Sequence, residues 1–195
     1  MPSPIRIDIR GVLGSGKSTL MHALSERLSL PARPEPLAEY EYLACAYEEP
    51  EKYRETAQVD IFQRLLTYQR QTGILDMTVE DCLFVFTKYY LGEDSKVYKY
   101  LETLYTAEVG SNRLVRPALT IFLEPDPEVV HRRIRLRRRR MESSVTLKQV
   151  KGLTALLRAD RETNYRSGDY VLVQDADVSR ELYTRIEDLV YARLN

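Results

Sequence analysis

The residue pattern with the clearest chemical use lies near the start of the chain. Between residues 11 and 18, the sequence GVLGSGKS matches the spacing G-x-x-x-x-G-K-[ST] in full. In such a loop, glycines let backbone N–H groups converge on phosphate oxygens, and the lysine ammonium reaches the β and γ phosphates. The hydroxyl after the lysine is a ligand for magnesium. The pattern predicts an ATP and Mg2+ site formed by Gly11, Gly14, Ser15, Gly16, Lys17 and Ser18.

The residues on either side of this loop support that interpretation. Ile5, Ile7 and Ile9 alternate with charged residues, as in a strand, and apolar residues recur at helical spacing over 18–28. A phosphate-binding loop requires this strand and helix, whereas an ordinary glycine-rich turn is the structural alternative. GTPases, motors and transporters share the loop. No D-x-x-G follows the second apolar strand, which weakens the GTPase interpretation and favours a phosphotransferase.

A cluster of positive charge follows Pro127. Seven arginines fall between residues 132 and 140. In a phosphotransferase, a hinged arginine segment that closes over the triphosphate would neutralise charge on the transferred group and exclude water. The alternatives are a solvated basic face and a localisation or nucleic-acid patch. Ile134 and Leu136 argue against a fully solvated segment, so we expect a lid over about 132–145.

An acid ends the second apolar strand. Residues 73–78 match a buried strand, and Asp76 lies near its carboxyl end, where open α/β sheets bind their ligands. Together with Ser18, this carboxylate is a candidate ligand for magnesium. Capping of the following helix, without any metal, explains an aspartate at this position equally well.

The composition is that of an ordinary globular chain of 195 residues, and we expect a single domain over 1–195. Basic and acidic residues both number 29, so the overall charge gives no reason to expect a nucleic-acid or membrane partner. We find no signal-peptide core and no run of membrane-spanning length, and Cys45 and Cys82 lack metal-ligand spacing. These features predict a cytoplasmic protein in a reducing compartment.

Periodicity, prolines and glycines predict the remaining elements. An extended segment ends near Leu37, and apolar strands cover 73–78, 118–123 and 170–173. Helical patterns cover 38–71 with an interruption near Pro50, 80–107 around a loop at 92–95, a basic stretch after Pro127, a stretch from Leu147, and 179–194. Alternating strands and helices predict an α/β fold. We expect a P-loop three-layer sandwich with a central parallel five-stranded sheet, helices on both faces and an Arg-rich lid.

Several segments outside the glycine-rich loop match motifs of one enzyme family. Residues 35–40, EPLAEY, are similar to E-P-V-x-x-W, and residues 76–86, DMTVEDCLFVF, align without gaps with E-R-S-V-Y-S-D-R-Y-I-F. Phe62-Gln63 matches an F-Q dipeptide. The chain resembles the deoxynucleoside kinases, which include deoxycytidine, deoxyguanosine and mitochondrial thymidine kinases, with herpesvirus thymidine kinases as distant relatives. The likeness spans nearly the whole chain.

The resemblance implies roles around the sugar and the phosphates. Glu35 corresponds to the general base that deprotonates the sugar 5′-hydroxyl, and a carboxylate beside the phosphate loop suits that role. Tyr47 corresponds to the residue that binds the 3′-hydroxyl, with Glu142 as its acidic partner. The lid arginines implied are Arg133, Arg137 and Arg139.

The resemblance also implies residues that bind the base. Gln58 keeps the family's spacing from Tyr47 to the glutamine that reads the base, and it shares a helical face with Ile61. Gln63 is a second candidate because of the F-Q dipeptide. A carboxamide can donate and accept at once, which suits the polar edge of a nucleobase. Phe86 matches the aromatic residue that stacks on the base.

Four positions depart from the family motifs. The arginine of E-R-S, which contacts the 5′-hydroxyl and the transferred phosphoryl group, is Met77 here, and the preceding acid is shortened to Asp76. A thioether cannot supply the missing charge, so a lid arginine replaces it, turnover is slow, or the phosphorylated group sits differently. Tyr40 replaces the tryptophan at the substrate site, and Cys82 replaces an aspartate that contacts the base in some members.

The function implied is ATP- and Mg2+-dependent phosphorylation of a deoxynucleoside 5′-hydroxyl. One alternative is a nucleoside monophosphate kinase such as a dTMP kinase-like enzyme, which needs additional cations for the acceptor phosphate. Another is a non-catalytic nucleotide-binding module, which the missing arginine suggests. Because family members pair through apolar helices, the tyrosine-rich stretch 89–105 predicts a homodimer.

Overall fold

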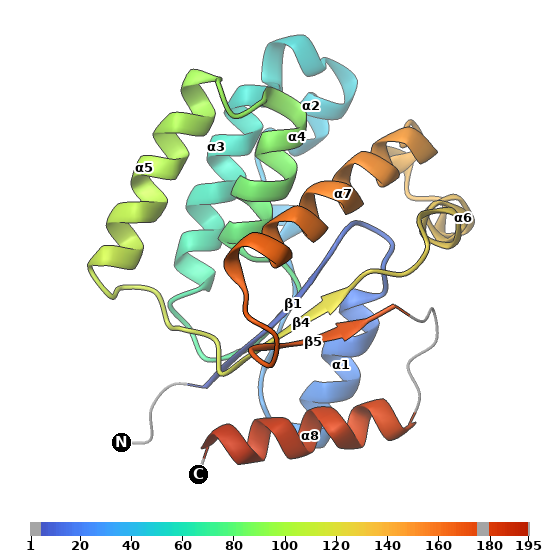
Figure 1. Ribbon diagram of the computed structural model, residues 1–195. Helices are drawn as coiled ribbons and strands as arrows, with labels where there is room; N and C mark the ends of the chain where they lie inside the picture. The colour runs from blue at the N-terminus through green and yellow to red at the C-terminus, as the bar shows by residue number, and fades with distance from the viewer. Residues whose placement is uncertain (1–4, 175–179, 195) are drawn as a thin grey trace.

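The computed structural model describes residues 5–174 and 180–194, and a five-stranded parallel sheet lies at its centre (Figure 1). The strands are arranged in the order β2-β3-β1-β4-β5. They are β1 (Arg6–Gly11), β2 (Ala32–Arg33), β3 (Gly73–Leu75), β4 (Leu119–Leu123) and β5 (Tyr170–Val173). Ile7 of β1 pairs with Ile74 of β3 and with Leu119 of β4. The predicted parallel sheet is confirmed, and its carboxyl ends share one edge.

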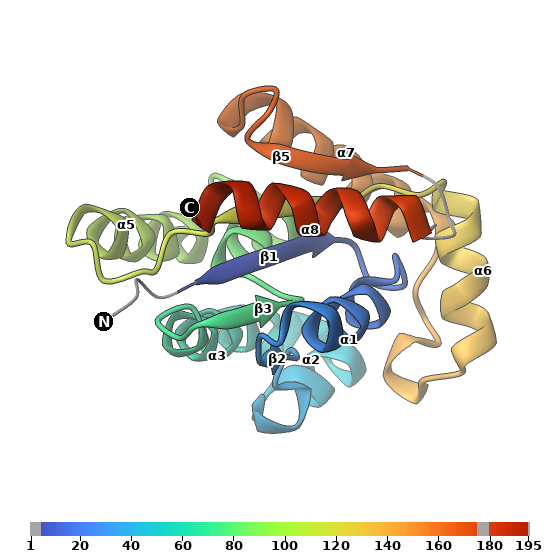
Figure 2. The ribbon, with the colours of Figure 1, turned by 90° about the horizontal axis from the view of Figure 1, so that it is seen from below.

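Helices cover both faces of the sheet, which confirms the predicted three-layer architecture (Figures 1 and 2). One layer holds α1 (Lys17–Leu28) and α8 (Arg180–Leu194). The other holds α3 (Pro50–Tyr68), the π-helix η2 (Asp81–Thr87), α5 (Lys96–Gly110) and α7 (Leu147–Asn164). The shorter helices are η1 (Leu37–Glu39), α2 (Leu43–Glu48), α4 (Lys88–Leu91), α6 (Pro127–Arg137) and η3 (Arg140–Glu142). In the part of the chain that the structure describes, none of the helices has the length and apolar character needed to cross a membrane.

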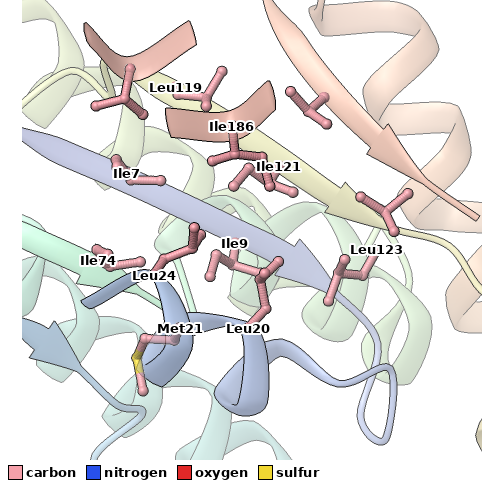
Figure 3. Packing of buried hydrophobic residues seen from close by; sticks show 13 residues of the cluster. Ile7, Ile9, Leu20, Met21, Leu24, Ile74, Leu119, Ile121, Leu123 and Ile186 are labelled. Atoms are coloured by element: carbon pink, nitrogen blue, oxygen red, sulfur yellow. The ribbon is translucent and has the colours of Figure 1, made fainter. Parts of the chain in front are cut away.

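Aliphatic side chains form the core between the sheet and the layer of α1 and α8 (Figure 3). Its fully buried members include Ile7, Ile9, Leu20, Met21, Leu24, Ile74, Ile121 and Ile186. Burial of each such side chain contributes about 1.5–3 kcal/mol relative to an exposed position. The core therefore fixes α1 against the sheet and places its first residues, Lys17 and Ser18, at the carboxyl edge.

The opposite face of β1 carries charged side chains that are also buried. Arg6, Asp8 and Arg10 are each no more than 2% exposed. Arg6 donates to Asp8 at 2.7 Å, and Arg10 donates to Asp81 of η2 at 2.8 Å and to Asp160 of α7 at 2.7 Å. Buried charges are tolerated when they are paired and hydrogen-bonded. The alternation of isoleucine with charge in β1 thus reflects two buried faces, one apolar and one ionic.

The helix that carries the first part of the lid and the helix that follows it have strong local start signals. Asp126 caps α6 by accepting a hydrogen bond from the backbone of Glu128 at 2.7 Å, and Pro127 occupies the first turn. Thr146 and Gln149 form a capping box at the start of α7. These caps fix the start of α6, which carries the first part of the lid, and the start of α7, which follows it.

Several element boundaries differ from the sequence prediction. The extended segment expected to end near Leu37 is a strand only at 32–33, and the strand expected over 73–78 ends at Leu75. The helix expected from residue 38 begins at Leu43, while its interruption near Pro50 is confirmed. Gly92, with φ of 79°, separates α4 from α5 at the predicted break. Residues 81–87 form a π-helix, which apolar periodicity did not predict.

Candidate active site

A cavity of about 920 Å³ lies at the carboxyl edge of the sheet, beneath the lid. Predicted residues that line it are Gly14, Ser15, Gly16, Lys17, Ser18, Glu35, Tyr47, Gln58, Asp76, Phe86, Arg133, Arg137, Arg139 and Glu142. Gly11 and Tyr40 are buried but do not line the cavity. Gln63 is exposed and does not line it either. The structure therefore brings together the predicted phosphate, sugar and base residues, with Gln63 left outside.

The glycine-rich loop has the backbone shape that its sequence requires. Gly14 and Gly16 have φ values of 77° and 105°, which are accessible to glycine without strain. A Cβ on Gly14 would lie 2.7 Å from Cγ1 of Ile134, so the loop packs directly against α6. The Lys17 ammonium donates to the carbonyl of Gly11 at 2.7 Å. The loop is thus a tight cradle with its lysine folded along it.

Asp76 connects three segments at the floor of the cavity. One carboxylate oxygen accepts a hydrogen bond from the Ser18 hydroxyl at 2.6 Å, and the other accepts from the backbone N–H of Glu35 at 2.6 Å. Asp76 is only 3% exposed. Among the described residues, no group of three or more His, Cys, Asp or Glu could hold a metal ion. Ser18 and Asp76 fit a magnesium ion that takes its other ligands from phosphates and water.

Glu35 lines the cavity near the phosphate loop, to which Asp76 links its backbone. Burial raises the pKa of Glu35 to about 7, the nearby Lys17 ammonium opposes this rise, and the Asp76 carboxylate adds to it. The adjacent Tyr40 hydroxyl lowers the pKa slightly. A carboxyl group with a pKa near neutrality is suited to accept a proton, because it is a stronger base than an exposed glutamate.

Met77 follows Asp76 along the chain and lines the same cavity, where it is 6% exposed. The guanidinium groups that line the cavity come from the lid: Arg133, Arg137 and Arg139. Arg133 reaches the phosphate loop, since its Nη1 donates to the carbonyl of Ser15 at 3.4 Å. Positive charge is therefore supplied from the lid side of the cavity, while the position after Asp76 is apolar.

Glu142 holds the lid arginines in place. Arg137 donates to both carboxylate oxygens of Glu142, and Arg139 lies 3.6 Å from the same carboxylate. Burial raises the pKa of Tyr47, and neighbouring Tyr90 and Glu142 raise it further. Tyr47 and Glu142 both line the cavity.

The two apolar residues within the arginine run behave differently. Ile134 is 2% exposed and packs in the core beneath α6, as the interrupted run predicted. Leu136 is 73% exposed, so the expectation that it packs is wrong. Residues 134 and 136 are about 200° apart on an α-helix, so both cannot face the same core.

The part of the cavity wall around Gln58 of α3 combines polar and aromatic groups. Gln58 is 6% exposed, and its side-chain oxygen accepts a hydrogen bond from the Thr87 hydroxyl at 2.8 Å. Phe86 and Cys82 line the cavity next to it. Burial raises the pKa of the Cys82 thiol to about 12, so this group is uncharged where some family members have a carboxylate.

Sequence reasoning missed residues that matter for this geometry. Thr87 was hidden at the end of an apolar stretch, and its contact with Gln58 joins positions 29 apart in the chain. The Arg10 interaction with Asp160 joins positions 150 apart. The charged residues of β1 were the available signal for the second contact, since a strand in the middle of a parallel sheet has both faces buried.

Comparisons with known proteins agree with the geometry. The family model for deoxynucleoside kinase matches residues 7–190. The chain is 32% identical over 156 residues to deoxyadenosine kinase of Dictyostelium discoideum, covering 75% of this chain and 62% of that protein. It is 30% identical over 151 residues to deoxyadenosine/deoxycytidine kinase of Bacillus subtilis (strain 168), covering 73% and 70%. The matched region thus spans less than two thirds of the Dictyostelium enzyme's length.

A solved structure has the same fold. Deoxyadenosine kinase from M. mycoides with bound dCTP superposes with a TM-score of 0.79 at 19% sequence identity, covering 96% of this chain and 100% of that one. Its likeness supports the arrangement of the sheet and its helices. With a family match that covers nearly all of the described sequence, the chain belongs to the deoxynucleoside kinase family.

Proposed function

We propose that the protein transfers the γ-phosphoryl group of ATP to the 5′-hydroxyl of a deoxynucleoside in a Mg2+-dependent reaction. The observation that carries this proposal is the link through Asp76, which bonds to Ser18 of the phosphate loop and to the backbone of Glu35. A phosphate cradle and a proton acceptor are thereby held at one cavity. This is the arrangement that phosphoryl transfer to an alcohol requires.

In the proposed step, Glu35 accepts the proton of the 5′-hydroxyl as its oxygen forms a bond to the γ-phosphorus. The bond from that phosphorus to the oxygen bridging to the β-phosphate breaks, and ADP leaves. Lys17 and the lid residues Arg133 and Arg137 stabilise negative charge on the transferred group. A magnesium ion held by Ser18 and Asp76 would neutralise phosphate charge. Tyr47 and Glu142 hold the 3′-hydroxyl, and Phe86 stacks on the base.

The names of the relatives suggest which acceptor to expect. The Dictyostelium and Bacillus relatives are a deoxyadenosine kinase and a deoxyadenosine/deoxycytidine kinase. We propose deoxyadenosine as the preferred acceptor, with Gln58 rather than the exposed Gln63 at its base. Both cysteines are free, which suits the reducing, cytoplasmic compartment that we propose for the protein.

We also propose that the protein is a homodimer. Helix α5 lies at the outer edge of its layer in both views (Figures 1 and 2) and exposes Tyr100 by 51% and Val109 by 42%. A shallow groove of about 530 Å³, lined in part by Phe84 and Tyr105, runs beside it. A second copy of the chain would cover these apolar side chains.

The substitution Glu35→Gln tests the proposed reaction. Removing the proton acceptor while keeping nearly the same shape should lower kcat by about a hundredfold or more. The measurement is ADP release with each of the four deoxynucleosides, alongside the corresponding 5′-monophosphates as acceptors. ATP binding by the variant, measured by calorimetry, serves as the control and should be unchanged.

Two results would contradict the proposal. Absence of ADP release with all four deoxynucleosides would rule out the kinase activity, and full activity of the glutamine variant would rule out Glu35 as base. Faster reaction with the 5′-monophosphates than with the deoxynucleosides would favour a nucleoside monophosphate kinase instead.

A further inference from the structure

A buried hydroxyl lies beside Gln58 and takes no part in the proposed transfer of the phosphoryl group. Thr87 is fully buried and does not line the cavity, and its Oγ1 donates to Gln58 Oε1 at 2.8 Å. Gln58 itself does line the cavity. Thr87 therefore contacts the cavity through its strong hydrogen bond to the carboxamide of Gln58 and its weaker contact with Cys82, which also lines the cavity.

A thiol lies near the same oxygen, and the backbone carbonyl of Gln58, also 4.0 Å away, is an alternative acceptor for its single proton. Sγ of Cys82 is 4.0 Å from Gln58 Oε1 and 3.9 Å from Thr87 Oγ1. Its thiol is fully buried and keeps its proton, because burial raises the pKa of Cys82 to about 12. The Thr87 hydroxyl could also accept from the amide nitrogen, but among the described residues its own proton would then have only the sulfur of Cys82 to donate to, which is a weak acceptor. The surroundings thus favour one orientation of the amide.

The other end of the amide is left for a ligand. Within residues 5–174 and 180–194, no group accepts a hydrogen bond from Nε2 of Gln58, and the residue borders the cavity. An amide nitrogen carries two donors, so at least one is available to a molecule in the cavity. The oxygen keeps one lone pair besides the one that Thr87 uses.

The π-helix explains why Thr87 and Cys82 reach the same atom. In an α-helix, positions five apart point about 140° away from each other. In η2, the N–H of Lys88 bonds to the carbonyl of Leu83, which is the wider i to i+5 spacing. That spacing brings side chains five apart toward one side, so Cys82 and Thr87 both contact Gln58 across the gap to α3.

An amide held in one orientation can distinguish a purine with a 6-amino group from one with a 6-oxo group. An amide that rotates freely can match either. The edge of adenine presents an amino donor at position 6 beside a ring-nitrogen acceptor at position 1. Hypoxanthine has the same outline with an oxygen acceptor at position 6 and an N–H donor at position 1. For a base in a fixed pose, a glutamine matches one pattern in one orientation and the other after a half-turn of its amide.

We propose that Thr87 is a positioning residue that holds the Gln58 carboxamide in one orientation, so that the site selects deoxyadenosine over its 6-oxo counterpart deoxyinosine. The inference rests on the proposed deoxynucleoside kinase activity. It adds a residue that acts behind the cavity wall and a reason for the π-helix at this position.

The test compares kcat/KM for deoxyadenosine and deoxyinosine in the wild-type protein, Thr87→Val and Thr87→Ser. The wild type should favour deoxyadenosine by about tenfold or more, because the wrong base leaves a buried polar group unpaired. Valine has nearly the shape of threonine but no hydroxyl, so the preference should fall by about tenfold. Serine keeps the hydroxyl and should keep the preference within about twofold. The KM for ATP should be unchanged in both variants.

The three variants and the two nucleosides together test the role of the Thr87 hydroxyl. A valine variant with the wild-type preference, or a serine variant that loses it as fully as valine, would overturn the role of the hydroxyl. If the valine variant does not fold, Thr87→Cys replaces the strong donor with a weak one and should give an intermediate preference; an unchanged preference counts against the inference. Phosphorylation of neither nucleoside by the wild type would overturn the proposed function itself, whereas equal use of both would overturn only the inference.

Discussion

The proton acceptor of the proposed reaction lacks the neighbouring arginine that the family motif contains. Burial raises the pKa of Glu35 to about 7, and the cation that most strongly opposes this is Lys17. A thioether at Met77 adds no charge. Because only the carboxylate form can accept a proton, the fraction of active enzyme should decrease as the pH falls through the pKa of Glu35. The acid limb of the pH profile should therefore lie near neutrality.

Restoring the family residue should move that limb. In Met77→Arg, a guanidinium beside Asp76 favours the ionised form of Glu35 and lowers its pKa, so the loss of kcat/KM should begin at a lower pH than in the wild type. A profile from about pH 5 to about pH 9 measures the shift. Met77→Gln, which adds polarity without charge, is the matched control and should keep the wild-type limb. An arginine variant with the wild-type limb would disprove the electrostatic explanation.

At the scale of secondary-structure elements, β1 organises the site through both of its faces. Its isoleucines anchor α1, which starts at the phosphate loop, while Arg10 binds Asp81 of η2 and Asp160 of α7. The guanidinium of Arg10 also lies 5.1 Å from the centre of the Phe122 ring. Arg10, which directly precedes the glycine-rich loop, thus connects the phosphate end of the cavity to η2, the helix that carries Cys82, Phe86 and Thr87.

Removing that connection should destabilise the fold. Arg10→Met leaves the Asp81 and Asp160 carboxylates buried without their cation, which should lower the free energy of unfolding by about 3–5 kcal/mol. Urea unfolding followed by circular dichroism measures this. Lys151→Met, which breaks an exposed pair with Glu128 on the surface of α7, is the control and should cost at most about 1 kcal/mol.

The pH dependence of this loss has a definite sign. Burial raises the pKa of Asp81 even with Arg10 present, and without Arg10 the pKa should rise further. A carboxyl group with a raised folded-state pKa loses stability as the pH rises through that value. The destabilisation of the Arg10→Met variant should therefore be smaller in mildly acidic buffer than at neutral pH. A penalty that grows on acidification would argue against the ionic explanation.

At the scale of the whole molecule, the question is what covers the outer surface of α5. The proposed homodimer predicts about twice the monomer mass in light scattering coupled to size exclusion. Tyr100→Glu places a charge on the exposed face of α5 and should shift the protein to the monomer. Tyr191→Glu is the matched control, because Tyr191 is 53% exposed on α8, on the other side of the sheet. A monomeric wild type, or equal effects of both substitutions, would contradict this interface.

The backbone shape of the phosphate loop and its place at the cavity could be predicted from sequence alone. The positions of Gly14 and Gly16 specify left-handed backbone that other residues rarely adopt, and the lysine and serine follow at set distances along the chain. Alternating strand and helix periods likewise determined the parallel sheet and its two helical layers. The loop and the individual strand and helix patterns are local, since each depends on residues close together in the chain.

The contacts at the nucleobase end of the cavity could not be predicted in this way. Gln58 and Gln63 are five residues apart, about 140° around α3, and only the packing of α3 against η2 turns the first inward and leaves the second exposed. The same packing brings Thr87 to Gln58, and the packing of α7 against the sheet buries Arg10 against an aspartate 150 positions away. Sequence by itself thus determined the fold class, the phosphate loop and the candidate base Glu35. Tertiary structure alone decided which polar side chains meet, because contacts between distant segments depend on how helices rotate about their axes to fill the core.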